Sequence, residues 1–337
     1  MVRLMAVLLV GCVTDRAPTW TPDQGDPADG TRSFGWQPVD QVQVPGIGSA
    51  ALHAHGASAH MGMAGVTCLW REGGIDSGWT GPFDEDDDVE EGDEDVVAGT
   101  TTTDLGDITA LRSAAGLTLL VERGTSTEEP RGDGATLGEP NSWAILRNAT
   151  PGVHGGFLDD GRFLDLVPHG ERCAVRTVSL DGSELLVGGL PFDCAQVSDT
   201  AVDPSGVLFA AAGGRVWRFD VHGTSLSLLT PSADRVAWDG VNGRLVTSDR
   251  DGVHGWIPTS DGWTAQWTVV TDGPMDHLAV LPSGEVVGAQ GAALWRWRHG
   301  EVTGLHRVPG LRALSVATAA ERVLAAGDGG FSVLRPE

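Results

Sequence analysis

Three histidines lie close together in the stretch LHAHGASAHMGM, which contains His53, His55 and His60 as well as Met61 and Met63. If a β-strand and a turn form here, His53 and His55 point to one face of the strand, and His60 can reach back toward them. Imidazole nitrogens, with a thioether nearby, suit copper or zinc. The spacing matches no established metal-binding motif, so histidines without a metal are the alternative interpretation.

Ten carboxylates occupy the twelve positions of DEDDDVEEGDED, which runs from Asp84 to Asp95. Asp84, Asp86 and Asp88 have the alternating spacing of a calcium loop, and Asp95 stands at its twelfth position. The sixth position is Val89, where such a loop needs glycine, so the run is not an EF-hand. Repulsion between the charges favours a solvated loop, inserted at about residues 76–100. Weak binding of calcium, or of a basic partner, is the alternative.

The chain begins with Arg3 and a short apolar run from Leu4 to Val10, followed by Gly11 and Cys12. A positive residue, an apolar stretch and a small residue are typical of a secretion signal. The ending LVGC resembles the lipobox of bacterial lipoproteins, which implies cleavage before Cys12 and acylation of that cysteine. An ordinary signal peptide and a misplaced start codon are the alternatives.

This resemblance divides the chain into a signal peptide (1–11), a lipid-anchored flexible tether (12–34) and a folded body (35–337). The tether is rich in Pro, Asp, Gly and Thr and lacks apolar periodicity. We therefore expect an exported protein, anchored to the bacterial cell envelope at the outer membrane or periplasmic face. Its contact with the membrane is then through the N-terminal lipid only.

Three cysteines remain in the body, which an exported protein exposes to an oxidising compartment. Cys173 begins one predicted strand, and Cys194 follows the next strand of the same unit. The sequence therefore predicts a disulfide between Cys173 and Cys194 across that hairpin. Cys68 lies in an apolar strand and is expected to be a buried free thiol.

The charge balance excludes several functions, because the chain has no lysine and a formal net charge of -24. Without lysine there is no Schiff-base, P-loop or general-base lysine. The excess of acid argues against binding to nucleic acid or to anionic lipid through a basic patch. The 48 glycines favour many short strands joined by tight turns over long helices.

A repeated pattern of apolar stretches and turns fills the body. Seven units begin near residues 46, 107, 153, 198, 233, 274 and 309. Asp160-Gly161, Ser205-Gly206, Asn242-Gly243 and Ser283-Gly284 stand at the first turn of their units, and such pairs tolerate the positive φ of tight hairpins. Fourth strands are predicted at 184–187, 225–229, 264–270 and 301–308.

Four antiparallel strands in each unit of this length are typical of propeller blades. The pattern resembles the bacterial propellers of the WD-repeat and NHL-like type over about residues 36–337. The resemblance implies an all-β, seven-bladed β-propeller of four-stranded antiparallel blades. The tryptophans predicted on third strands, Trp70, Trp217, Trp256 and Trp295, are expected to fill the gaps between neighbouring blades.

Ring closure is also predicted, because the last unit ends after its third strand. The segment GWQPVDQVQV (35–44) precedes the first unit and is similar to residues 300–308, a predicted fourth strand. We expect this N-terminal segment to complete the last blade, which leaves no open edge in the ring.

No catalytic residues stand out, so the predicted function is a non-catalytic scaffold that binds an envelope protein or a small ligand, with no cofactor and as a monomer. The alternative is a metal-assisted hydrolase or lactonase in the central channel. Propeller lactonases hold calcium with Asn, Asp and Glu, and this chain has only Asn141, Asn148 and Asn242. The fold alone does not decide between these functions.

Overall fold

The computed structural model is all-β, as the sequence predicts, and its one helical element is a short 3-10 turn, η1 (Cys194–Gln196), among the residues that it describes. These residues are 33–43, 50–55, 58–63, 66–71, 74–76, 107–114, 117–123, 134–139, 142–147, 155–179, 183–222, 225–230, 232–260, 262–317, 321–327 and 330–337. Within these ranges no helix is long and apolar enough to cross a membrane.

The strands form four-stranded antiparallel sheets, each built from consecutive hairpins. The first sheet contains β2 (Ala50–His55), β3 (Ser58–Met63), β4 (Val66–Arg71) and β5 (Gly74–Asp76). The second contains β6 (Asp107–Ala114), β7 (Leu117–Arg123), β8 (Gly134–Glu139) and β9 (Ser142–Arg147). The third contains β10 (Gly156–Phe157), β11 (Phe163–His169), β12 (Arg172–Val178) and β13 (Glu184–Gly189).

The next three sheets repeat this order. They are β14 (Val197–Asp203), β15 (Val207–Ala212), β16 (Arg215–Asp220) and β17 (Ser225–Thr230); β18 (Arg235–Asp239), β19 (Arg244–Asp249), β20 (Gly252–Thr259) and β21 (Gly262–Val269); and β22 (His277–Val280), β23 (Val286–Gln290), β24 (Ala293–Arg298) and β25 (Glu301–Arg307). The four fourth strands predicted in the third to sixth units all occur, with ends that differ by at most two residues.

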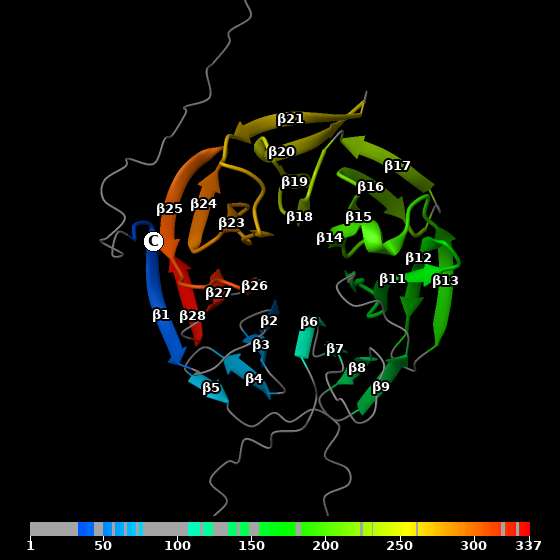
Figure 1. The fold of residues 1–337 in the computed structure, drawn as a ribbon, viewed down its shortest axis with the longest axis horizontal. Helices are drawn as coiled ribbons and strands as arrows, with labels where there is room; N and C mark the ends of the chain where they lie inside the picture. The colour runs from blue at the N-terminus through cyan, green and yellow to red at the C-terminus, as the bar shows by residue number, and fades with distance from the viewer. Residues whose placement is uncertain are drawn as a thin grey trace, which may run out of the picture.

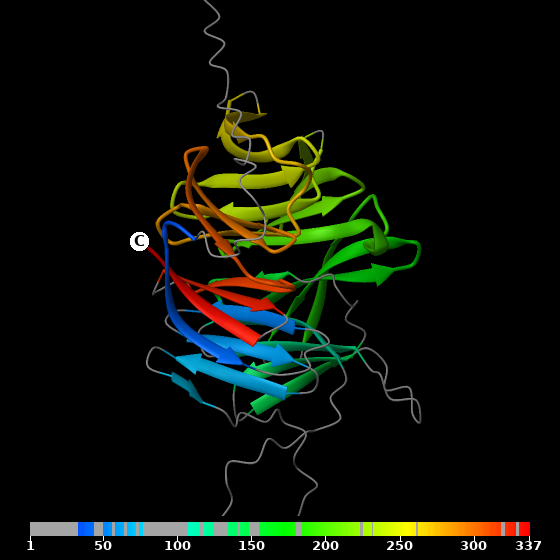
Figure 2. The same ribbon diagram turned by 60° about the vertical axis from the view of Figure 1, so that its left-hand side comes forward.

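The last sheet joins the two ends of the folded chain. It contains β26 (Ala313–Ala317), β27 (Arg322–Gly327), β28 (Gly330–Pro336) and β1 (Trp36–Gln43), and β1 pairs antiparallel with β28 from Trp36↔Pro336 to Gln43↔Gly330. Figure 2 shows the blue β1 beside the red β28. This is the pairing predicted from the sequence for residues 35–44.

The first strands of the sheets lie toward the middle of the molecule, and the fourth strands lie at its periphery (Figure 1). Each first strand contacts the first strand of the next sheet, from β2 through β6, β10, β14, β18, β22 and β26 and back to β2. The arrangement of repeated antiparallel sheets is therefore propeller-like.

The end of the predicted tether lies beside β25. Phe34, expected to lie in the tether, forms a β-bridge with Leu305 through two backbone hydrogen bonds of 3.0 Å. Ser33 Oγ is 2.7 Å from His306 Nδ1. Ser33 and Phe34 therefore contact β25, at the end of the segment that the sequence assigns to the tether.

The first turns have the conformation that their sequences predict. Gly161, Gly206, Gly243 and Gly284 all have positive φ, from 58° to 111°. At Gly284 a Cβ would also lie 2.2 Å from Nδ2 of Asn242 in the preceding sheet, so this turn needs glycine for contact as well as for φ.

Tryptophans of the third strands pack between sheets. Trp217 on β16 lies against buried residues of the β10–β13 sheet, with its ring centroid 5.5 Å from that of Phe192. Trp256 and Trp295 pack in the same way against the sheets that precede theirs. These rings fill the gaps between sheets, as predicted; the side chain of Trp70 lies outside the described residues.

Candidate functional site

Arg235, the first residue of β18, is the polar side chain with the most hydrogen bonds at the beginning of the first strands of the sheets. Its Nε donates to the Asp276 carbonyl oxygen (2.8 Å), and its Nη1 donates to the carbonyl oxygens of Ser198 (3.1 Å) and Asp234 (3.0 Å). Ser198 belongs to the preceding sheet and Asp276 directly precedes the first strand of the following one. One guanidinium therefore links three consecutive sheets where their inner strands begin.

Carboxylates beside Arg235 also bind backbone groups. Asp199 Oδ2 accepts from the N–H of Val236 in the next sheet (3.0 Å), and its Oδ1 accepts from the N–H of Thr200 (2.9 Å). Asp276 Oδ2 accepts from the N–H of Gly291 (2.7 Å). These side chains are used to hold the strand starts in position, which favours a structural role over a catalytic one.

His277 is the first residue of β22 and follows directly after Asp276. Burial lowers the pKa of this imidazole, and the nearby positive charge of Arg235 lowers it further, while Asp276 and a hydrogen bond with the Arg312 backbone act in the opposite direction. Asp199, Arg235 and His277 occupy equivalent places in successive units and form the polar lining of this region.

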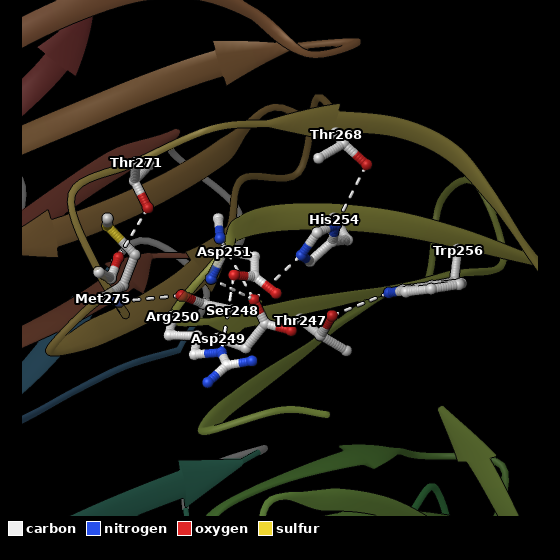
Figure 3. A network of polar contacts seen from close by, with 12 residues as sticks. Thr247, Ser248, Asp249, Arg250, Asp251, His254, Trp256, Thr268, Thr271 and Met275 are labelled. Atoms are coloured by element: carbon white, nitrogen blue, oxygen red, sulfur yellow. Dashed lines mark hydrogen bonds and ion pairs between the residues drawn. The ribbon is translucent and has the colours of Figure 1, made fainter. Parts of the chain in front are cut away.

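A second polar network ties the strands of the β18–β21 sheet together (Figure 3). Asp249 Oδ1 accepts from the N–H groups of Asp251 (2.8 Å) and Gly252 (3.2 Å) and lies 3.2 Å from His254 Nε2. His254 Nδ1 lies 3.1 Å from Thr268 Oγ1 on β21. The result is a carboxylate–imidazole–hydroxyl chain that ends at an exposed threonine.

The Asp249 carboxylate is stabilised in its charged form. Burial alone would raise the pKa of Asp249, but the Asp251 N–H, the hydrogen bond and charge of His254 and a hydrogen bond from Ser232 together lower the pKa below its ordinary value. On β20 Trp256 Nε1 donates to Thr247 Oγ1 (2.8 Å), so β19 and β20 share a second side-chain bond. The network is well suited to fixing the sheet.

Buried ion pairs lie within three sheets, one of which is the β18–β21 sheet itself. Arg176 Nη2 pairs with Asp165 in the β10–β13 sheet, and burial raises the pKa of Asp165 to about 6 although Arg176 opposes this shift. Two further pairs join Arg244 to Asp239 (2.6 Å) and Arg296 to Glu285 (3.5 Å). Such pairs contribute little net stability. Their main effect is to fix the positions of the polar groups that they pair.

Apolar side chains are exposed on the fourth strands of two consecutive sheets. Leu185 and Leu186 on β13 are 61% and 48% exposed, and Leu226 and Leu228 on β17 are 36% and 45% exposed. Both strands lie at the periphery of the molecule (Figure 1). Each of these outer strands therefore presents two leucines to solvent.

The structure places the predicted site residues as follows. Cys173 and Cys194 form a disulfide, which links β12 to the turn after β13. His53 and His60 are direct register partners on β2 and β3, and His55 is the partner of Ser58; nothing is described of the histidine side chains. Cys12 and the acidic run, with Asp84, Asp86, Asp88 and Asp95, lie outside the described residues.

Within the part of the chain whose positions are described, no group of three or more His, Cys, Asp or Glu side chains is placed to hold a metal ion. The sequence matches no protein-family model, and a comparison with curated proteins finds no similar sequence.

Sequence reasoning missed the Arg235 contacts, the Asp249 network and the exposed leucines. The only available signal was positional: Asp199, Arg235 and His277 follow one another at the same place in successive units. Aligning the units would have brought these residues together, since equivalent positions of a propeller-like fold lie around one axis.

Proposed function

We propose that the chain is a closed seven-bladed β-propeller of the WD-repeat or NHL-like type, with β1 as the outer strand of the last blade. The continuous circle of contacts between first strands supports this assignment. So does the β1–β28 pairing, which joins the two ends of the folded chain. A closed ring is a rigid support on which loops and outer strands can present a binding surface.

We propose further that the protein is a non-catalytic scaffold of the bacterial envelope, anchored through a lipid on Cys12, that binds another protein. The observation that carries this proposal is the group of exposed leucines on β13 and β17, which we call the outer leucine surface: Leu185, Leu186, Leu226 and Leu228. Leucines left in water on the outer strands of two consecutive sheets are most simply explained by a partner that covers them.

The test is affinity capture of envelope proteins by the full-length chain and by two multiple variants. In the first variant all four leucines of the outer leucine surface are replaced by serine. In the matched control, Val241→Ser and Val270→Ser remove apolar groups of comparable exposure, 68% and 59%, from other places. We expect a discrete partner that is captured by the wild type and the control and is lost with the leucine variant.

Equal capture by all three proteins would contradict the proposal, as would the absence of any partner that depends on the leucines. The substituted side chains are partly exposed, so the four-leucine variant should lose a few degrees of melting temperature but remain folded at the temperature of the capture. A partner lost together with the fold would therefore be recognised.

A second candidate function, hydrolysis, is favoured by the order Asp249–His254–Thr268. A hydroxyl within hydrogen-bond reach of an imidazole that a carboxylate orients is the arrangement of an activated nucleophile. The test is hydrolysis of p-nitrophenyl acetate by the wild type and by Thr268→Val, which removes the hydroxyl and keeps the shape. A rate that falls to that of buffer in the variant would favour this function, and equal rates would exclude it for this threonine.

A further inference from the structure

The outer edge of β13 has backbone groups that face away from its own sheet. β13 is the last strand in the order β10-β11-β12-β13. The Ser179 N–H donates to the Ser183 carbonyl oxygen (2.9 Å), and Leu186 lies three positions further along the same antiparallel register. Since paired and unpaired positions alternate, the N–H and C=O of Leu186 point outward.

The other end of the strand gives the same result. The Leu190 N–H donates to the Cys173 carbonyl oxygen (2.8 Å), so Gly189, the next position in the register with β12, also directs its backbone groups outward. Outward hydrogen-bonding groups therefore lie at Leu186 and at Gly189, on either side of the β-bulge at which the register with β12 shifts.

The side chains of β13 leave this edge unprotected. Leu185 and Leu186 are consecutive and so lie on opposite faces of the strand, and both are exposed. Natural sheet edges are usually protected by charged residues, proline or β-bulges. β13 begins with Glu184 and its register with β12 shifts at one bulge, but no charged residue or proline occurs from Leu185 to Gly189.

The edge is also held rigidly. The Cys173–Cys194 disulfide ties the chain after β13 to β12. At Gly188 a Cβ would lie 2.9 Å from the Phe219 ring of the following sheet, so the strand is packed closely against its neighbour. A strand that is already fixed in its extended form loses little entropy when another strand pairs with it.

These features specify the occupant. An extended segment can replace water on the outward backbone groups, and the leucines on both faces favour apolar side chains in that segment. The net charge of -24 repels a second acidic copy and attracts a basic partner.

Resting on the proposed function of a partner-binding scaffold, we propose that β13 binds an extended, arginine- or lysine-bearing segment of another protein, which adds to the sheet as a fifth strand. The partner's backbone pairs with Leu186 and Gly189, and its apolar side chains cover Leu185 and Leu186.

The test uses the full chain and a short fluorescent peptide that alternates valine and arginine, with binding measured by fluorescence anisotropy. Two variants at one position separate side chain from backbone. Leu186→Ala removes the leucine and keeps the outward N–H, whereas Leu186→Pro also removes that N–H, which proline permits at a sheet edge because no bond within the sheet is lost. We expect binding to the wild type, a loss of about threefold in Leu186→Ala, and a further loss of about fivefold or more in Leu186→Pro.

Hydrogen exchange gives a second measurement that needs no variant. We expect the peptide to slow exchange in the segment 184–190 of the wild type. Equal binding by Leu186→Ala and Leu186→Pro without protection of this segment would overturn the proposal, since the peptide would then be bound by charge elsewhere. No binding of the peptide, or a dimer that Leu186→Pro dissociates in sedimentation velocity, would also overturn it.

The outcome is distinguishable from failure of the proposed function. If the envelope partner is lost with the four-leucine variant but is captured equally by Leu186→Ala and Leu186→Pro, strand addition is wrong and partner binding at the outer leucine surface stands. If capture does not depend on the leucines, the proposed function itself fails.

Discussion

Replacement of Trp36 by alanine tests whether β1 is an integral part of the ring. The indole is 3% exposed on a strand that begins at this residue, and it packs with Val287, Leu294 and Leu334 of the last two sheets. The Arg296 guanidinium carbon lies 5.1 Å from its ring centroid. Trp36 is therefore the main side-chain contact through which β1 is held to the β22–β25 sheet.

The expected loss follows from the size of the buried group. A buried tryptophan replaced by alanine costs about 3–5 kcal/mol, and the lost cation–π contact adds about 1 kcal/mol. The indole Nε1 has no hydrogen-bond partner, so no hydrogen bond is lost with it. At roughly 2 °C for each kcal/mol in a domain of this size, the melting temperature should fall by about 8–12 °C.

Circular dichroism during heating measures the change, with Val39→Ala as the matched control. Val39 lies on the same strand and is 42% exposed, so its variant should lose no more than about 0.5 kcal/mol. Melting temperatures of the two variants that agree to within about 2 °C would refute the reasoning, because β1 would then contribute nothing specific to the body.

Three further predictions concern the polar and covalent links. Replacing Cys173 and Cys194 by alanine, which opens a loop with a sequence separation of 21, should lower the unfolding free energy in urea by about 3 kcal/mol, and reductant should have the same effect on the wild type. Arg235→Ala should lower the unfolding free energy by about 2 kcal/mol in the same assay. Arg235→Lys should not restore this stability, because one ammonium cannot reach all three carbonyl oxygens that the guanidinium binds. The lowered pKa of Asp249 stabilises the fold above its ordinary value of 3.8, and this contribution is lost as pH falls through the folded pKa. The stability difference between wild type and Asp249→Asn should therefore shrink as the pH falls below about 4.

The strands and turns could be predicted because their signals are local. Each first turn, such as the one at Gly161, is encoded by two neighbouring residues. The pairing of residues 35–44 with the last unit could be predicted because that unit lacks a fourth strand of its own. The bridge between Phe34 and Leu305 could not be predicted, because the two residues are distant in sequence.

The polar contacts between sheets could not be predicted from the sequence. Arg235 binds three carbonyl oxygens, and a backbone carbonyl leaves no trace in residue type. The chain from Asp249 through His254 to Thr268 depends on the register of β20 with β21, in which His254 and Thr268 are direct partners. Periodicity locates such strands but does not fix their register to one residue.

The exposure of Leu185 and Leu186 was missed for a different reason. The sequence ELLVGG predicts a strand whether the strand is buried or lies at the edge of a sheet. Only the place of β13 as the fourth strand of a radial sheet shows that its leucines face water.

Site-specific photocrosslinking in cells is the most direct test of partner binding at the outer leucine surface. A photoreactive amino acid replaces Leu185 or Leu228 in the full-length protein, and Val241 serves as the control position. The account predicts one discrete crosslinked partner from both leucine positions and none from Val241. No crosslink at either leucine, or the same products from all three positions, would contradict it.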